Sequence, residues 1–161
     1  MAEGTYSNCT LTVTSNFGFE SDNLSISSFT IDTIAPSLSQ VTAVSSATND
    51  STPDYTFSSS EAGTITYGGS CSSSTTAATA SNNTVTFNSL SDGTYNDCTI
   101  TVTDNATNPS TTLSVNSFSV DTVTPTLSQV TAVPSPDNDS TPDYTFSSSE
   151  AGSISYGGDC S

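Results

Sequence analysis

Cysteines and carboxylates are the side chains of this 161-residue chain that could do chemistry, as disulfides or as ligands of a cation. The cysteines are Cys9, Cys71, Cys98 and Cys160, and the first and third, like the second and fourth, are 89 residues apart. Sixteen acidic residues stand against no Lys, Arg or His, so the formal net charge is −16. The chemistry open to the chain is therefore thiol oxidation and cation binding.

The absence of basic side chains excludes several classes of function. Binding of nucleic acid by counterion release and attraction to an anionic membrane surface both need Lys or Arg. Neither His nor Lys is present as a general base, so no partner can activate the many serines. No run of 18 apolar residues could cross a membrane. We therefore expect a protein that is not an enzyme, binds no nucleic acid and does not insert into a membrane through this segment.

The sequence repeats itself at an offset of 89 residues without a gap. Residues 49–57 reappear unchanged as 138–146, and Asp32-Thr33 recurs as Asp121-Thr122. A fixed period of this size predicts an array of like modules. We expect the C-terminal part of one repeat in 1–34, a complete repeat in 35–123 and the N-terminal part of the next in 124–161. The chain then resembles a window cut from a longer array.

Short alternating runs of apolar and polar residues predict an all-β fold. Between positions 36 and 121 these runs cover residues 38–44, 54–58, 64–67, 84–87, 94–103 and 113–120. Residues 72–81 predict a loop or a weak edge strand. In the last run the apolar phase slips by one residue between Val115 and Phe118, which predicts a β-bulge. Six or seven short strands per period predict tandem immunoglobulin-like β-sandwiches.

The cysteines of the complete repeat are expected to meet. Cys71 shares its face with the apolar residues of 64–67, and Cys98 shares the face of those in the strand that it begins. The third and sixth strands of such a sandwich are neighbours, which predicts a Cys71–Cys98 disulfide and an oxidising, extracellular or cell-surface location. A free buried thiol and a metal ligand are the alternatives. Cys9 and Cys160 have no partner at this spacing, so their bonds are expected between repeats or between molecules.

Carboxylates are expected to gather where one repeat joins the next. The incoming linker and two strand turns share one pole of an immunoglobulin-like sandwich, which places Asp32, Glu61 and Asp104 together. The next junction would hold Asp121 and Glu150. Oxygen ligands of this kind suit Ca²⁺. The alternative is that these residues are solvated acidic turns, in which Asp serves turn geometry.

Two tyrosines follow a Gly-Thr pair at equivalent positions of the repeat, Tyr6 and Tyr95. A tyrosine near the start of the sixth strand of a sandwich commonly bonds its hydroxyl back to nearby backbone. We therefore expect both residues to be structural rather than catalytic.

Three segments carry a resemblance to a known family. The stretches IDTIAPSLSQVTA, SSSEAGTITYGG and LSDGTYNDCTITVTD resemble the tandem bacterial Ig-like repeats of very large secreted and surface-anchored proteins. That resemblance implies a spacer, stalk or filament that supports adhesion or a matrix. Its partners would be neighbouring modules of the same chain or identical subunits in a fibre. The alternative function is a carbohydrate-binding module of a secreted protein.

Overall fold

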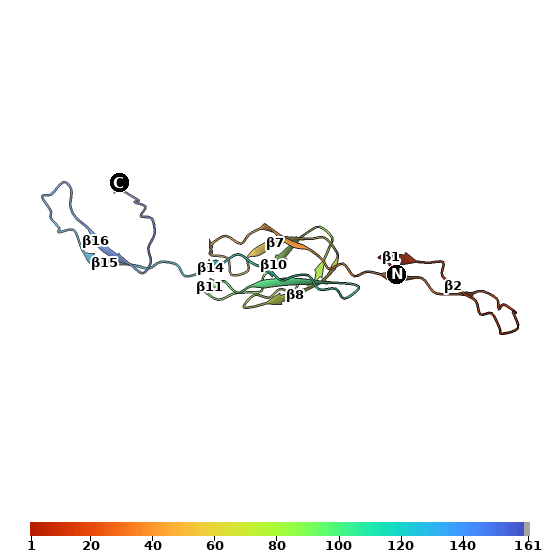
Figure 1. The fold of residues 1–161 in the computed structure, drawn as a ribbon. Helices are drawn as coiled ribbons and strands as arrows, with labels where there is room; N and C mark the ends of the chain where they lie inside the picture. Colours follow the sequence, from red (N-terminus) through yellow and green to blue (C-terminus); the bar gives the residue numbers. More distant parts are fainter. Residues whose placement is uncertain (160–161) are drawn as a thin grey trace. The chain divides into compact units, whose positions relative to one another are not determined.

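The computed structural model describes residues 1–159 and is all-β, with no helix among those residues (Figure 1). The predicted all-β class is confirmed. The chain divides into two compact units, Met1–Asp121 and Thr122–Ser161. This division lies two residues before the boundary expected after position 123, and it groups residues 1–34 with the segment that follows them. Within the described part of the chain, no helix is long and apolar enough to span a membrane.

Ten strands make up the middle of the chain. They are β5 (Leu38–Thr42), β6 (Ala47–Thr48), β7 (Asp54–Ser59), β8 (Gly63–Gly68), β9 (Ala77–Ala78), β10 (Asn82–Thr86), β11 (Gly93–Tyr95), β12 (Thr99–Asp104), β13 (Leu113–Ser114) and β14 (Phe118–Val120). They form three sheets with the orders β10-β7-β5, β13-β12-β8-β9 and β11-β14-β6. All three contribute to one apolar core, an arrangement consistent with a β-sandwich.

The strands β8 and β12 pair with each other, and the two cysteines lie just outside them, Cys71 after β8 and Cys98 before β12. The strands are antiparallel and pair over six residues, which is the whole length of both. Ile100 and Val102 of β12 are buried, whereas the threonines between them are only partly covered. β-Branched residues with a period of two favour a strand with one buried face. Gly63 permits the close approach, because a Cβ there would lie 2.3 Å from the carbonyl oxygen of Thr103.

The start and the end of the middle segment are tied together by β6 and β14. These two strands pair in parallel, and β14 also pairs with β11 on its other side. Asn116, just before β14, adds a second connection. Its Oδ1 accepts a hydrogen bond from the backbone N–H of Val44 (3.1 Å), and its Nδ2 donates to the Val44 carbonyl (2.8 Å).

The prediction of a β-bulge between Val115 and Phe118 is wrong. The pairs β12–β13 and β11–β14 keep one common register, so neither strand carries an extra residue. Instead, strand pairing is interrupted at the same level on both sides, at residues 96–98 between β11 and β12 and at residues 115–117 between β13 and β14. The side of the backbone that faces the core changes at each interruption. An irregularity in register does occur in β5, after Gln40.

The core is a single cluster of alternate strand residues. It contains Val44, Tyr55, Phe57, Ile65, Cys71, Ala78, Val85, Phe87, Leu90, Cys98, Ile100, Val102, Val115, Phe118 and Val120. Aromatic rings run through it, since Phe87 stacks on Tyr55 and on Phe118 with ring centroids 6.3 Å apart in each pair. Burial of these side chains is the main stabilising contribution to so small a fold.

The segments on either side form short antiparallel pairs. Before the core, β1 (Gly4–Tyr6) pairs with β4 (Phe29–Ile31), and β2 (Thr10–Leu11) pairs with β3 (Leu24–Ser25). After it, β15 (Leu127–Thr131) pairs with β16 (Thr145–Ser148). Many of their large apolar side chains are exposed, among them Leu11, Val13, Leu24, Ile26, Leu127, Val130, Tyr144, Ile154 and Tyr156. The apolar faces of these two segments therefore lack a covering layer among the described residues.

Candidate functional site

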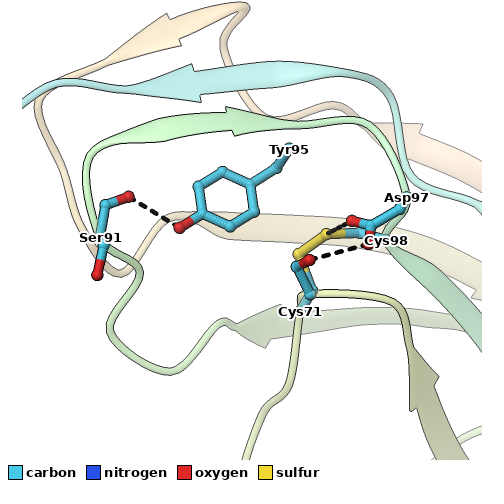
Figure 2. Close-up of a disulfide and its surroundings, with 6 residues drawn as sticks. Cys71, Ser91, Tyr95, Asp97 and Cys98 are labelled. Carbon is cyan, nitrogen blue, oxygen red and sulfur yellow. Dashed lines mark hydrogen bonds between the residues drawn. A yellow bond between two sulfur atoms is a disulfide. The ribbon is translucent and has the colours of Figure 1, made fainter.

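The predicted disulfide is present between Cys71 and Cys98 (Figure 2). Both cysteines are buried, and their Cα atoms are 5.2 Å apart. Cys71 follows the turn after β8, and Cys98 immediately precedes β12, so the bond closes one end of the β8–β12 pair. The two residues lie opposite each other because the antiparallel register brings the end of one strand to the start of the other.

A glycine turn shapes the backbone next to the disulfide. Gly69 has φ +72°, and a Cβ on it would lie 2.1 Å from the carbonyl oxygen of Asp97. The Ser70 hydroxyl donates a 2.8 Å hydrogen bond to the Asp97 carboxylate. This bond, with one from the Ser70 backbone, holds the pKa of Asp97 below its usual value. The turn and the start of β12 are thus connected by the disulfide and by hydrogen bonds.

Tyr95 and Tyr6 both bond backbone carbonyls four residues upstream. The Tyr95 hydroxyl donates to the carbonyl of Ser91 (2.8 Å; Figure 2), and the Tyr6 hydroxyl donates to that of Ala2 (2.8 Å). Each ring stacks on a phenylalanine of the paired strand, with centroids 5.3 Å apart. These contacts are those expected of structural tyrosines.

An acidic cluster lies where the incoming linker meets two turns. Asp32, Glu61 and Asp104 each offer one carboxylate oxygen, and these oxygens lie within 4.8 Å of one another. Asp32 follows β4, Glu61 lies between β7 and β8, and Asp104 ends β12. The structure therefore brings together the three residues that the sequence placed at this pole.

The cluster is held by hydrogen bonds from Asn108. Its backbone N–H donates to Asp104 Oδ1 (2.8 Å), and its Nδ2 donates to Asp104 Oδ2 (2.9 Å). Burial acts to raise the pKa of Asp104, but the hydrogen bonds from Asn108 and from the backbone of Ala106 and Thr107 together outweigh it, and the pKa lies below its usual value. The Asn108 Nδ2 also donates to the carbonyl of Asp32 (3.1 Å), which fixes the linker against this turn.

Like charges meet in this cluster. Burial raises the pKa of Glu61, and the carboxylates of Asp32, Asp104 and Glu3 raise it further. Glu3 was not among the residues predicted here. It reaches the junction because its carboxylate accepts hydrogen bonds from the backbone and the hydroxyl of Thr33. Asp92 stands at the equivalent position one period later, so the sequence carries an acidic residue at this place in both repeats.

The chemistry open to the cluster is the binding of a hard cation. Ca²⁺ takes oxygen ligands at 2.3–2.6 Å, so oxygens within about 5 Å of one another can share one ion. The three carboxylates fit that requirement. The solvated acidic turn remains the alternative, because Asn108 already holds Asp104 in place. Calcium here stays a prediction.

The remaining predicted residues are not members of this cluster. Asp121 ends the first unit, where its backbone N–H donates to the carbonyl of Thr48 (3.0 Å). Glu150 belongs to the second unit, where its backbone N–H and carbonyl bond the Ser148 hydroxyl. Cys160 lies outside the described residues. Cys9 is a free, partly buried thiol.

Comparison with known proteins adds no relative from which a role could be transferred. A scan against protein-family models, a search of curated proteins and a search of solved structures found no match to this chain.

Proposed function

We propose that this chain is a non-enzymatic extracellular structural protein, built from immunoglobulin-like β-sandwiches that follow one another with an 89-residue period. It serves as a stalk, spacer or filament at a cell surface or in a matrix. Its partners are like modules, either in the same chain or in identical subunits. The resemblance to tandem bacterial Ig-like repeats agrees with this role.

The recurrence of strand pairing carries the proposal. Gly4 lies opposite Ile31 in β1–β4, and 89 residues later Gly93 lies opposite Val120 in β11–β14. β2–β3 has the register of β12–β13 after the same shift. β15–β16 has that of β5–β7, including the irregularity in the first strand. A repeat that keeps register as well as sequence supports one module design used three times.

Side-chain hydrogen bonds recur at the same offset. The Ser60 hydroxyl accepts a bond from the backbone N–H of Ser37 (2.9 Å), and the Ser149 hydroxyl accepts one from that of Thr126 (2.9 Å). The two tyrosine hydroxyl bonds described above are a second recurring set. The flanking segments thus have the local structure of a module even though each supplies only part of one.

The part of the chain that contains β5 to β14 is called the middle module below. The directions of its strands suit it to carry tension. Force enters through the linker before β5 and leaves after β14. Because β6 and β14 are parallel neighbours, such a force slides one along the other and loads their hydrogen bonds together rather than one at a time. The bonds involved run from Ser119 N–H to the Ser46 carbonyl (3.0 Å) and from Asp121 N–H to the Thr48 carbonyl (3.0 Å). The Asn116 side chain adds its two bonds to Val44.

Force spectroscopy on the full chain, held at its two ends, tests this role. We expect one discrete unfolding event for the middle module. Asn116→Ala should lower the unfolding force, because it removes both side-chain bonds to the first strand region. Asn88→Ala is the matched control. It removes a 2.9 Å bond to the Ser72 hydroxyl, which connects neither β6 nor β14, and should leave the force unchanged.

Two results would count against a mechanical role. Smooth extension without a discrete event would mean that the module carries no load. An equal loss of force in both asparagine variants would mean that the β6–β14 connection is not what resists the pull.

One observation favours the alternative, a carbohydrate-binding function. Phe17 and Phe19 are 88% and 76% exposed on a turn of the first unit, and the equivalent positions one period later are Ala106 and Asn108. Exposed aromatic rings can stack on sugar faces. Specific binding on a glycan array that is lost in Phe17→Ala/Phe19→Ala would support this alternative and displace the structural role.

A further inference from the structure

The two flanking segments expose side chains that the middle module buries. Val102 is 0% exposed, but its counterpart Val13 is 64% exposed. Ile65 is 3% exposed, but its counterpart Ile154 is 59% exposed. In the middle module these residues belong to β12 and β8, which cover each other's backbone and side chains. Each flank thus carries one half of a β8–β12 pair.

The two flanks together contain most of one core. Of the fifteen buried apolar residues of the middle module, twelve have an apolar counterpart in the flanks. Five of these counterparts lie after position 122, namely Val133, Tyr144, Phe146, Ile154 and Cys160. The other seven lie before position 34, namely Met1, Cys9, Leu11, Val13, Ile26, Phe29 and Ile31. Only Ala78, Val85 and Phe87 lack one, because residues 73–89 have no counterpart in the flanks.

Strand length also depends on the partner. β12 spans six residues beside β8, whereas its counterpart β2 has two. Residues 152–157, the counterpart of β8, are all described and belong to no strand. The same sequence pattern therefore forms a full strand only where its neighbour is present.

Two glycines provide an independent sign of the absent neighbour. Gly63 and Gly69 are required in the middle module, because a Cβ on Gly63 would collide with a carbonyl oxygen of β12, and one on Gly69 with the carbonyl oxygen of Asp97, just before β12. Their counterparts Gly152 and Gly158 have nothing within 4 Å. These positions are already shaped for close approach by another strand.

We propose that the segment after position 122 of one copy docks on residues 1–31 of a second copy, and that the two form a joint module between chains that lacks only the counterpart of residues 73–89. The middle module fixes the expected register. Thr10 would lie opposite Gly157, and Ser15 opposite Gly152, with Val13 and Ile154 paired on the inner face. This inference rests on the repeated module of the proposed function and adds a partner, which is another copy of this chain.

Docking between chains is favoured over closure within one chain by the path of the backbone. The linker at Asp32 reaches the pole of the middle module that holds Glu61 and Asp104. β14 ends opposite Gly93, at the start of the continuous path through β11 and β12. That path of twelve residues, 93–104, is about 40 Å long. The chain therefore enters and leaves the middle module at opposite ends of that module.

A disulfide between Cys9 and Cys160 of different copies is the chemical readout. These residues are the counterparts of Cys98 and Cys71. With oxidised glutathione as the oxidant, the two protein thiols become one disulfide, and the glutathione disulfide accepts two electrons and two protons to become two thiols. Digestion of mixed isotopically light and heavy chains, followed by mass spectrometry, should recover linked peptides with one light and one heavy half.

Sedimentation of the full chain under reducing conditions tests the non-covalent contact. The mass should rise from 16.4 kDa to multiples of it as concentration increases. Val13→Asp and Ile154→Asp should each weaken assembly by more than about 100-fold, because each places an unpaired carboxylate in the joint core. Thr12→Asp and Ser155→Asp, each next to one of these residues and on the outward face of the strand that the joint module would form, are the matched controls and should assemble like the parent chain.

Mixing the two core-face variants gives the sharpest result. Val13→Asp leaves the C-terminal docking segment unchanged, and Ile154→Asp leaves the N-terminal docking segment unchanged. Each alone should be monomeric, and an equal mixture should stop at two chains. Ile154→Asp that dimerises alone would show pairing of like faces and overturn the proposal. So would a monomeric parent chain at millimolar concentration, or a Cys9–Cys160 bond found only within single chains.

These outcomes can be told apart from failure of the proposed function. The force measurement reports on the middle module, which is complete in each copy. A monomeric chain whose middle module still resists force would remove the docking and leave the structural role intact.

Discussion

Removal of the Cys71–Cys98 disulfide should cost the middle module a large part of its stability. The bond joins residues 27 apart in sequence. On the chain-entropy model, closing a loop of that length stabilises the fold by about 3.5 kcal/mol at 25 °C. A single domain of this size has a total stability of roughly 5–15 kcal/mol. The expected fall in the melting temperature is about 14–28 °C, since 1 kcal/mol corresponds to about 4–8 °C in a domain of under 100 residues.

Thermal unfolding followed by circular dichroism measures this effect on the full chain. The parent chain is compared with and without a reductant, and with Cys71→Ala/Cys98→Ala. The variant should melt at or below the temperature of the reduced parent, because it also loses two buried sulfur atoms from the core. Cys9→Ser is the control, since it removes a thiol that is not in a disulfide within the described residues.

A small difference between the oxidised and reduced parent would refute this reasoning. If the two melted within about 5 °C of each other, the disulfide would contribute little to stability, and the core alone would account for the stability of the module. An equal shift in Cys9→Ser would point to a bond elsewhere.

Three further predictions concern single side chains. Glu61→Gln should raise the melting temperature at neutral pH, since the raised pKa of Glu61 means that its charge destabilises the fold. The gain in melting temperature should shrink as the pH falls through that pKa. It should vanish below pH about 4.5, where Glu61 of the parent chain is protonated in both the folded and the unfolded state. A gain that persists at low pH would contradict the role of charge. Gly69→Ala should destabilise the module by about 1–3 kcal/mol, because the residue has φ +72° and a Cβ would meet a facing carbonyl. Gly158→Ala, with φ +69° and no neighbour within 4 Å, should leave the unfolding midpoint of the module unchanged in denaturant titration. Tyr95→Phe should cost about 0.5–1.5 kcal/mol in the same titration, through loss of the bond to the Ser91 carbonyl; an unchanged midpoint would mean that water replaces this bond at no cost.

Local patterns in the sequence predicted the strands and the core well. Alternation of apolar residues places Phe57, Val85 and Ile100 inward, and all three are buried. The disulfide followed from the same alternation, because strands three and six of a sandwich are neighbours. These features depend on a period of two and on general packing, both of which can be seen in one chain.

Features that depend on particular hydrogen bonds could not be predicted in this way. Alternation alone cannot distinguish an inserted residue from two strands that change face together, which is why the bulge near Phe118 was predicted wrongly. The two bonds from Asn116 to Val44 join positions 72 residues apart, and no local pattern marks them. Asn108 likewise organises the acidic cluster through its amide, although only the carboxylates drew attention in the sequence.

The position of the Cys71–Cys98 bond also sets how far the molecule lengthens when it is pulled. Once β6 and β14 separate, tension passes straight across the sulfur bridge, and the 27-residue span behind it stays slack. At about 3.5 Å per extended residue, roughly 95 Å of chain per module is withheld from stretching. A line of such modules in oxidising surroundings would yield in short steps and recoil from a shorter length. Reducing surroundings would release the withheld span and turn the same chain into a longer, softer tether.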